Sequence, residues 1–330
     1  MAFEYRENPE FSWSFSRQSA MNGCKRKYYY NYYGAHNGWL NNSPEVTEEQ
    51  KVTYRYKNVT TLQLAFGNHV HEAIKTIIKM PSEADGLKEL VKKMLHDTCV
   101  KGSCLTKWWE QPKQYPALVE TLYLGGFKSP ETLKQIASIN KKMEKIENVF
   151  NTKTFSEIKE EKVKTVLEVD EPLSNTACGN FDLNGYKIFS KIDFLYIRDD
   201  GKYVVVDWKT YGKDPAFEKN LNNKDYKQLL LYVDYVRRNY NIPLEQIVCR
   251  LENVVTGTTF EVENIPEIEI KALEREIKSS IEEMSLYVKD TNLEDNKAVD
   301  KKFFIQAGAD VEDKKCVSCS FRNLCWGTGN

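Results

Sequence analysis

The sequence lacks the features that identify several large classes of protein. No run of about 18 apolar residues occurs in the 330-residue chain, so we expect no transmembrane helix and no membrane partner. Its 47 basic and 48 acidic side chains leave a net charge of −1, which argues against a protein coated in positive charge but allows one local basic groove. It has no G-x-x-x-x-G-K-[ST] motif, so an ATP-driven motor would have to be a partner.

The N-terminus, MAFEYRENPEFSWSFSRQ, also lacks the basic and then apolar layout of a signal peptide. We therefore expect a cytoplasmic protein, in which the eight cysteines are thiols, metal ligands or cluster ligands rather than disulfides. Four of them lack ligand spacing and are expected to be buried or free thiols: Cys99, Cys104, Cys178 and Cys249.

The order of hydrophobic patterns predicts one α/β domain over residues 1–330. Residues 60–79 have apolar positions at helical spacing, and residues 84–149 are expected to form a charged helical insertion. Strand-like runs follow at 162–173, 186–198 and 202–210, then a helix at 224–239, a strand at 246–255 and a helix at 266–289.

Two aspartates lie in the strand-like runs that flank the turn RDDGK at 198–202. Gly201 suits the left-handed position of a three-residue hairpin loop. With that loop, Asp193 lies directly opposite Asp207, with Cβ atoms ~5 Å apart, and Lys209 follows on the same face. A two-residue loop would instead place Trp208 opposite Asp193.

Two carboxylates that close repel each other unless a divalent cation lies between them. The hairpin therefore predicts two acids and an ammonium group that converge, which suits the activation of a water and the stabilisation of charge on a phosphate. The alternative is an Asp–Lys salt bridge on a solvated strand face.

These residues resemble a known family. Asp193 followed by Asp207-Trp208-Lys209 on the next strand resembles the D…(D/E)-x-K signature of the PD-(D/E)XK nuclease superfamily. Downstream, Gln228 and Tyr232 in QLLLY resemble the Q-x-x-x-Y motif of its RecB-like branch. The resemblance implies a restriction-endonuclease-like core, in which helices flank a mixed sheet.

Upstream, FGNHVHEA resembles the G-x-x-x-H motif of the same branch, with Gly67 and His71 in the matching places. His69 is the other candidate for the motif histidine. Because residues two apart do not share a helix face, His69 and His71 point in roughly opposite directions. The resemblance implies that His71, Asp193 and Asp207 hold Mg²⁺ or Mn²⁺. It also implies a catalytic role for Lys209 with the attacking water, and it implies that Gln228 and Tyr232 are supporting or DNA-contacting groups.

The implied function is that of a metal-dependent DNA nuclease, and we expect an exonuclease that prefers single strands. Recombination, phage DNA processing and CRISPR adaptation are the candidate pathways. The rival hypothesis is a catalytically silent, nuclease-derived DNA-binding or scaffold subunit. The intact set of Asp193, Asp207 and Lys209 argues against it, because a decayed nuclease need not keep all three.

The C-terminal sequence KKCVSCSFRNLCWGTGN contains three cysteines at ligand spacing, one thiolate short of a closed site. Cys24 is the natural fourth ligand beside Cys316, Cys319 and Cys325. This arrangement resembles the iron–sulfur RecB-like nucleases, namely the AddB-type and CRISPR-adaptation enzymes, although Lys25 replaces the usual proline after the first cysteine. The resemblance implies a [4Fe–4S] cluster that joins the termini, and the same spacing also permits a structural Zn²⁺ site.

Two aromatic stretches also contain or follow lysines, YYYNYY at 28–33 and KWWEQPKQY at 107–115. Such a composition suits stacking on single-stranded bases, and equally the packing of amphipathic helices in a core. The partner we expect is DNA with a single-stranded portion, together with a helicase or a CRISPR integrase as a possible protein partner.

Overall fold

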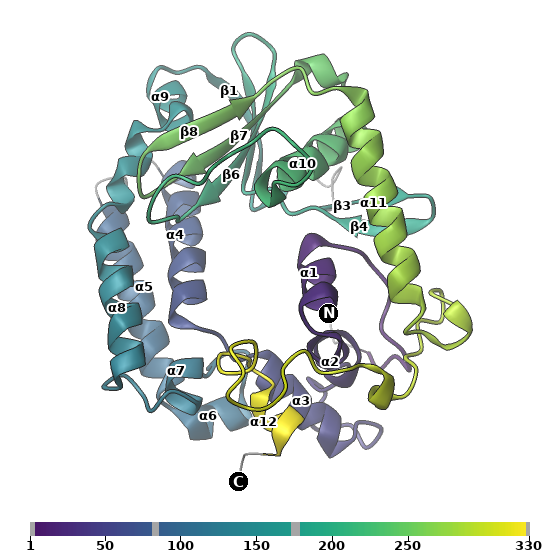
Figure 1. The fold of residues 1–330 in the computed structure, drawn as a ribbon. Coiled ribbons are helices and arrows are strands. Elements are labelled where there is room, and N and C mark those ends of the chain that lie inside the picture. The colour runs from purple at the N-terminus through teal and green to yellow at the C-terminus, as the bar shows by residue number, and fades with distance from the viewer. Residues whose placement is uncertain (1–3, 81–85, 173–178, 328–330) are drawn as a thin grey trace.

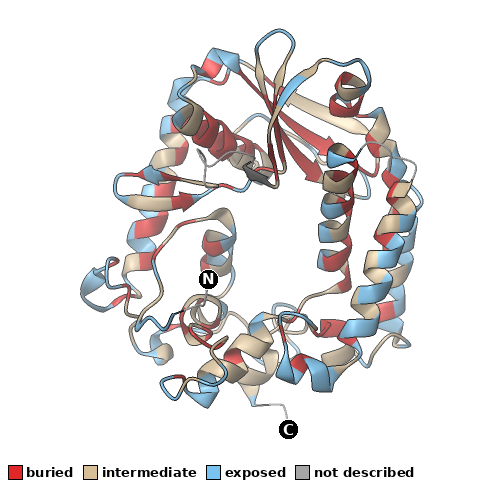
Figure 2. Ribbon diagram, turned by 180° about the vertical axis from the view of Figure 1, so that it is seen from behind, coloured by how far each residue is buried: buried red, intermediate tan, exposed pale blue. Residues whose placement is uncertain are grey.

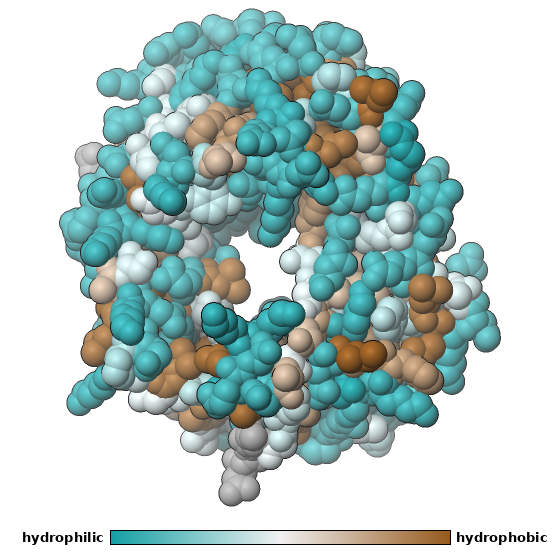
Figure 3. Space-filling model, in the orientation of Figure 1, coloured by the Kyte–Doolittle hydropathy of each residue, from teal (hydrophilic) through white to brown (hydrophobic). Residues whose placement is uncertain are grey.

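The computed structural model describes residues 4–80, 86–172 and 179–327. Its elements surround a central opening, which Figure 1 shows face-on and which passes through the molecule in the space-filling view of Figure 3. Helix α4 borders the opening on one side and helix α1 on the other (Figure 1, Figure 2). Among the described residues, no helix is both long and apolar enough to cross a membrane.

The part of the chain that precedes the sheet is helical. Its elements are α1 (Phe15–Gly23), α2 (Lys25–Tyr29), the π-helix η1 (Tyr30–Gly34), α3 (Glu48–Lys57), α4 (Leu62–Lys79), α5 (Leu87–Gly102), α6 (Leu105–Glu110), α7 (Val119–Leu122), α8 (Pro130–Met143), the 3₁₀ helix η3 (Ile146–Asn151) and α9 (Lys153–Lys159).

The second half contains the strands and the C-terminal helices. They are β1 (Val163–Val169), β2 (Glu171–Pro172), β3 (Asn180–Leu183), β4 (Tyr186–Phe189), β5 (Phe194–Arg198), β6 (Tyr203–Lys209), α10 (Lys224–Tyr240), η4 (Leu244–Gln246), β7 (Ile247–Asn253), β8 (Thr258–Val262), α11 (Glu267–Ser285), η5 (Lys289–Thr291), η6 (Lys301–Phe303) and α12 (Arg322–Trp326).

A mixed sheet with the strand order β2-β1-β5-β6-β7-β8 forms the centre of the fold. Strands β6 and β7 are parallel and connected through α10, whereas the other neighbours are antiparallel. Side chains alternate along β6, so Val205 packs toward α10 and α11, while Val204 and Val206 pack toward α4, α5 and α8. The same alternation directs Asp207 and Lys209 toward α10. Figure 2 shows how deeply the sheet is buried between these layers.

The β5–β6 hairpin has the predicted register. Phe194 lies opposite Val206, the N–H of Arg198 donates to the carbonyl of Lys202 at 2.9 Å, and Gly201 has a φ of +83° in the three-residue loop. Asp193, the residue before β5, therefore lies opposite Asp207.

Three features of the strands differ from the sequence prediction. The run at 162–173 is not one strand, because β1 ends at Val169 and, after Asp170 with a φ of +63°, β2 turns back to pair with β1. The run at 186–198 is not one strand, because β4 leaves to pair with β3 in a separate two-stranded sheet before β5 begins. The break falls at Ser190, whose N–H donates to the carbonyl of Gly179 at 2.9 Å. Strand β8 was not predicted, and it follows a turn at Gly257, where φ is +77°. Helices α5 to α8 lie in residues 84–149, the segment expected to be helical. That this segment is an insertion in a single domain stays a prediction.

Helix α4 is held at its N-terminus by two side chains. Thr61 is the N-cap, and its hydroxyl accepts a hydrogen bond from the N–H of Leu64 at 3.2 Å. The fully buried Glu120 of α7 accepts a bond from the N–H of Leu62 at 3.1 Å. The helical segment after α4 thus fixes the start of the helix that carries His71.

The two ends of the described chain pack together. The hydroxyl of Tyr30 donates to the carbonyl of Leu324 at 3.1 Å, and its ring stacks on Phe321 with centroids 5.2 Å apart. Tyr123 donates to the carbonyl of Ser320 at 2.8 Å. These contacts close the lower side of the opening in Figure 1.

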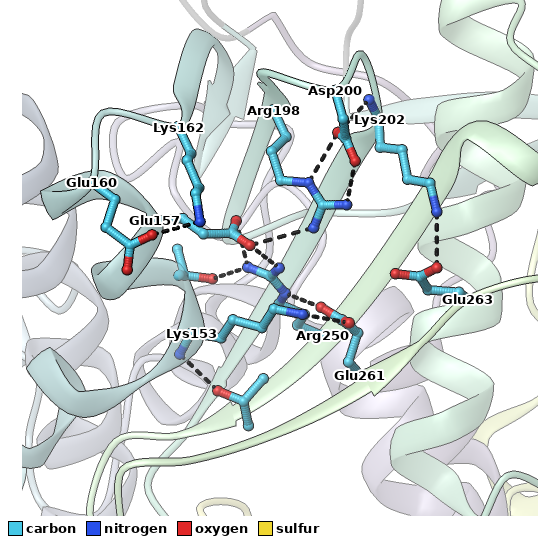
Figure 4. A network of polar contacts seen from close by, with 12 residues as sticks. Lys153, Glu157, Glu160, Lys162, Arg198, Asp200, Lys202, Arg250, Glu261 and Glu263 are labelled. Carbon is cyan, nitrogen blue, oxygen red and sulfur yellow. Dashed lines mark hydrogen bonds and ion pairs between the residues drawn. The ribbon is translucent and has the colours of Figure 1, made fainter.

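A buried ion-pair network fixes α9 to the sheet (Figure 4). Arg250 of β7 has no exposed side-chain surface and pairs with Glu157 at 2.6 Å and with Glu261 at 2.7 Å. Arg198 joins Glu157 from β5 at 3.3 Å. Breaking such a buried pair by removing one partner typically costs about 3–5 kcal/mol, so the network is part of the scaffold.

Candidate active site

Asp193 is bound through both carboxylate oxygens. Its Oδ1 lies 3.3 Å from Nδ1 of His71, which α4 presents from the far side of the strand end. Its Oδ2 accepts a hydrogen bond from the backbone N–H of Trp208 at 2.9 Å. The competing His69 faces α5, where its Nε2 lies 2.8 Å from Oγ1 of Thr98. The structure therefore brings His71, and not His69, to the carboxylates.

Asp207 lies in a ring of four side chains from β6 and α10. Its Oδ2 is 2.6 Å from Nζ of Lys209, and Lys209 donates to Oε1 of Gln228 at 2.9 Å. The Nε2 of Gln228 donates to the hydroxyl of Tyr232 at 2.5 Å, and Tyr232 donates to Oδ1 of Asp207 at 3.3 Å. The i, i+4 spacing of Gln228 and Tyr232 places both on the helix face that meets Asp207.

The two carboxylates have different proton affinities. Burial raises the pKa of Asp207 to about 6, against the lowering effect of Lys209 and with a contribution from Asp193. Burial also opposes ionisation of Asp193, but the charge and hydrogen bond of His71 bring the pKa of Asp193 below its ordinary value. Burial disfavours the charged form of His71, yet Asp193 raises the pKa of His71 above its usual range.

Lys209 remains positively charged in this setting. Burial would lower the pKa of its ammonium group, but Asp207 and then Asp225 raise that pKa above its ordinary value. A permanently charged ammonium group cannot act as a general base at neutral pH. It can stabilise negative charge that develops on a bound anion.

Two residues that were not predicted from the sequence extend this network. Asp225 of α10 places Oδ1 3.8 Å from Nζ of Lys209. The hydroxyl of Tyr211, just beyond β6, donates to the Asp225 carboxylate at 3.0 Å. Asp225 lies three residues before Gln228, so the helical spacing that linked Gln228 and Tyr232 could also have indicated it.

The donor groups of His71, Asp193 and Asp207 are of the chemical kinds that bind divalent cations. Carboxylate oxygens are the ligands that Mg²⁺ and Mn²⁺ prefer. The pKa of Asp207 is raised by burial and further by the charge of Asp193, and a cation between the acids would favour the ionised form of both. The three side chains presently contact one another or Lys209. Within the described part of the chain, no group of three or more His, Cys, Asp or Glu side chains is arranged as a metal site. Their role as metal ligands stays a prediction.

The four cysteines singled out in the sequence line one small cavity. Cys24 reaches it from the start of α2, and Cys316, Cys319 and Cys325 reach it from the C-terminal segment. Burial raises the pKa of Cys325 to about 11, with further contributions from the neighbouring cysteines. Gly308 is in close contact with Cys316, because a Cβ atom on this glycine would lie 2.5 Å from Sγ. Metal or cluster binding by these cysteines is not shown and stays a prediction.

The other cysteines differ in how far they are buried. Cys249 is buried in β7, Cys99 and Cys104 are partly exposed, and Cys178 lies outside the described residues.

The aromatic side chains with buried positions in the two stretches are Tyr28, Tyr30, Tyr33 and Trp108. Trp109 is 43 % exposed and lies under the guanidinium group of Arg55, 4.3 Å from its ring centroid.

Comparison with known proteins identifies the family. No curated protein matches the chain. A sequence profile of the PD-(D/E)XK nuclease superfamily matches residues 12–326, a span that contains the opposed aspartates, Lys209 and His71. This superfamily consists generally of metal-dependent nucleases that hydrolyse phosphodiester bonds, typically with Mg²⁺ or Mn²⁺. The mixed sheet with helices on both faces agrees with its core fold. The chain therefore belongs to the PD-(D/E)XK nuclease superfamily.

Proposed function

We propose that the protein is a metal-dependent DNA exonuclease of the RecB-like type that prefers single strands. The observation that carries this proposal is the placement of Asp193 opposite Asp207, with Lys209 on the same strand face. A catalytically silent scaffold would have no need to keep two acids and an ammonium group in one buried place, since burying them is costly.

The residues have distinct roles in the proposed hydrolysis. His71, Asp193 and Asp207 would hold Mg²⁺ or Mn²⁺, which supplies Lewis acidity toward water and phosphate oxygens. Lys209 stabilises the negative charge that develops during in-line attack. Gln228 and Tyr232 fix the positions of Lys209 and Asp207 through the ring of contacts described above.

The preference for single strands and free ends rests on the central opening. Hydrophilic side chains border the opening above and below in Figure 3. Gln228, which contacts Lys209, also lines a cavity whose walls include α1, beside this opening. A strand that enters a closed opening must have an end, so linear DNA should be a better substrate than circular DNA.

The test compares linear and circular single-stranded DNA of the same sequence, with Mn²⁺ or with a chelator. We expect the linear strand to be degraded from an end with metal only, and we expect the circular strand to resist. Cleavage of both at equal rates would contradict the exonuclease proposal. Full activity of Asp207→Ala would contradict the assignment of the site.

We further propose that Cys24, Cys316, Cys319 and Cys325 bind a [4Fe–4S] cluster. Support comes from their convergence on one cavity, because four cysteines brought to one place are the ligand set of a [4Fe–4S] cluster. The same set also suits a single Zn²⁺. Anaerobically purified protein should be brown and contain iron and sulfide. Colourless protein with one zinc per chain would contradict the cluster and leave the nuclease proposal intact.

A further inference from the structure

We propose that the cavity between α1 and the N-terminus of α10 binds the sugar-phosphate backbone of a single strand beside the scissile bond. This inference rests on the proposed nuclease function and specifies where its substrate lies. The cavity has a volume of about 720 Å³. Cavities of this size hold extended small ligands, so it fits a few nucleotides of one strand and not a turn of duplex.

The cavity adjoins the catalytic residues at one end. Gln228 lines it and accepts a hydrogen bond from Nζ of Lys209 at 2.9 Å. Cys24, Lys27 and Lys315 line it as well, and all three also line the cavity of the four cysteines. A strand held along it therefore passes from the reacting phosphate toward the closed lower side of the ring (Figure 1).

The charged side chains that line the cavity are all basic. Four lysines line it, Lys27, Lys57, Lys224 and Lys315, and the described residues around it include no acidic side chain. None of the four is in an ion pair with a described carboxylate. The neighbouring cations Lys25 and Arg322, by contrast, pair with Glu283 and Glu312. Ammonium groups that line one cavity without counter-charges repel one another, and a phosphate backbone bound there reduces that repulsion.

The cavity wall also suits nucleobases. Phe15 and Tyr32 line it, each partly exposed, and Tyr32 is fixed from one side by the guanidinium group of Arg17, 4.5 Å from the ring centroid. Between them, α1 presents only small side chains, including Ser19 and Ala20. Aromatic rings next to a row of ammonium groups are the combination that binds single strands without sequence preference.

The test uses Lys57→Ala/Lys224→Ala, because neither lysine lines the cysteine cavity. Lys271→Ala/Lys278→Ala, two exposed positions on α11, is the matched control. Binding of a fluorescent oligothymidylate is measured against salt concentration without divalent metal. Each lost phosphate contact should reduce the slope of log K against log salt by about 0.7, so we expect a loss of about 1.4 for the cavity pair and no change for the control pair.

Lys57→Arg/Lys224→Arg should restore the slope, because the charge is kept. An unchanged slope in the alanine pair, while the wild type binds and cleaves DNA, would overturn this inference and leave the nuclease proposal standing. Equal affinities for thymidine monophosphate and for the oligonucleotide would also overturn it, because the ligand of the cavity would then be a single nucleotide and not a strand. Absence of both binding and cleavage in the wild type would overturn the proposed function itself.

Discussion

Asp193 and Asp207 face each other across the open end of the β5–β6 hairpin, and each has a different cationic partner. Asp193 pairs with His71 of α4 at 3.3 Å, and Asp207 pairs with Lys209 of its own strand at 2.6 Å. The carboxylates are thus held in a pair that costs free energy until a cation reaches them.

Replacing Asp207 with Asn should stabilise the metal-free protein. The raised pKa of about 6 means that the folded state binds the Asp207 proton more tightly than the unfolded state does. Stability is therefore lost as pH rises from the unfolded value of about 3.9 to about 6. At pH 8, with chelator, Asp207→Asn should raise the free energy of unfolding by about 1–3 kcal/mol and abolish cleavage.

The advantage of Asp207→Asn should disappear near pH 4, where Asp207 itself is protonated. Asp199→Asn, in the exposed turn of the same hairpin, is the matched control and should change neither stability nor activity. Urea unfolding at the two pH values is the measurement. If Asp207→Asn is less stable than wild type at pH 8, ionised Asp207 does not destabilise the folded state.

Metal affinity should fall at acid pH. Bound metal must displace a proton from Asp207, whose pKa is about 6, and from His71, whose pKa lies above its ordinary value because of Asp193. We expect Mn²⁺ to bind at least about tenfold more weakly at pH 5.5 than at pH 7.5, measured by calorimetry. In His71→Asn one of the two protons is absent, so the pH dependence should be shallower. An equal affinity at both pH values would exclude this site as the metal-binding site.

Asp225 should act on catalysis through Lys209. It lies 3.8 Å from the ammonium group and helps to raise its pKa. Asp225→Asn should therefore lower the cleavage rate by about tenfold at neutral pH with little change in DNA affinity, because the Lys209 ammonium group loses one of the carboxylates beside it. Asp225→Glu should restore the rate, and Tyr211→Phe should change it less, since only the donor to Asp225 is removed. A wild-type rate in Asp225→Asn would show that Asp225 does not act on catalysis through Lys209.

Gly308 should be required for the cysteine site. A methyl group there would lie 2.5 Å from Sγ of Cys316, so the segment must shift. We expect Gly308→Ala to lower the metal or cluster content of purified protein and to cost about 1–3 kcal/mol of stability. Gly86→Ala, where no atom lies within 4 Å of the added Cβ, is the control. Full metal content in Gly308→Ala would show that Cys316 is not a ligand.

The sequence was sufficient for the parts of the site that depend on local periodicity. The turn at Gly201 fixes the register that places Asp193 opposite Asp207, and the i, i+4 spacing of Gln228 and Tyr232 fixes their common face. Such relationships follow from strand and helix geometry alone, so one sequence can predict them.

The parts that depend on contacts between distant segments could not be predicted. Asp225 is an ordinary acid of a first helical turn until the sheet places Lys209 beside it. The split of 186–198 into β4 and β5 depends on pairing with β3, and the central opening depends on the contact of the chain ends at Tyr30 and Phe321. These features arise from tertiary packing, which local patterns do not encode.

The most direct test of hydrolysis at this site is cleavage and binding by Lys209→Ala. The substrate is an end-labelled linear single strand with Mn²⁺, and Lys202→Ala, at the other end of the same hairpin, is the matched control. We predict that Lys209→Ala loses at least about 10²-fold in cleavage rate while its affinity for the strand changes by less than about threefold, and that Lys202→Ala behaves like wild type. Cleavage by Lys209→Ala at the wild-type rate would show that the cluster of Asp193, Asp207 and Lys209 does not perform the hydrolysis.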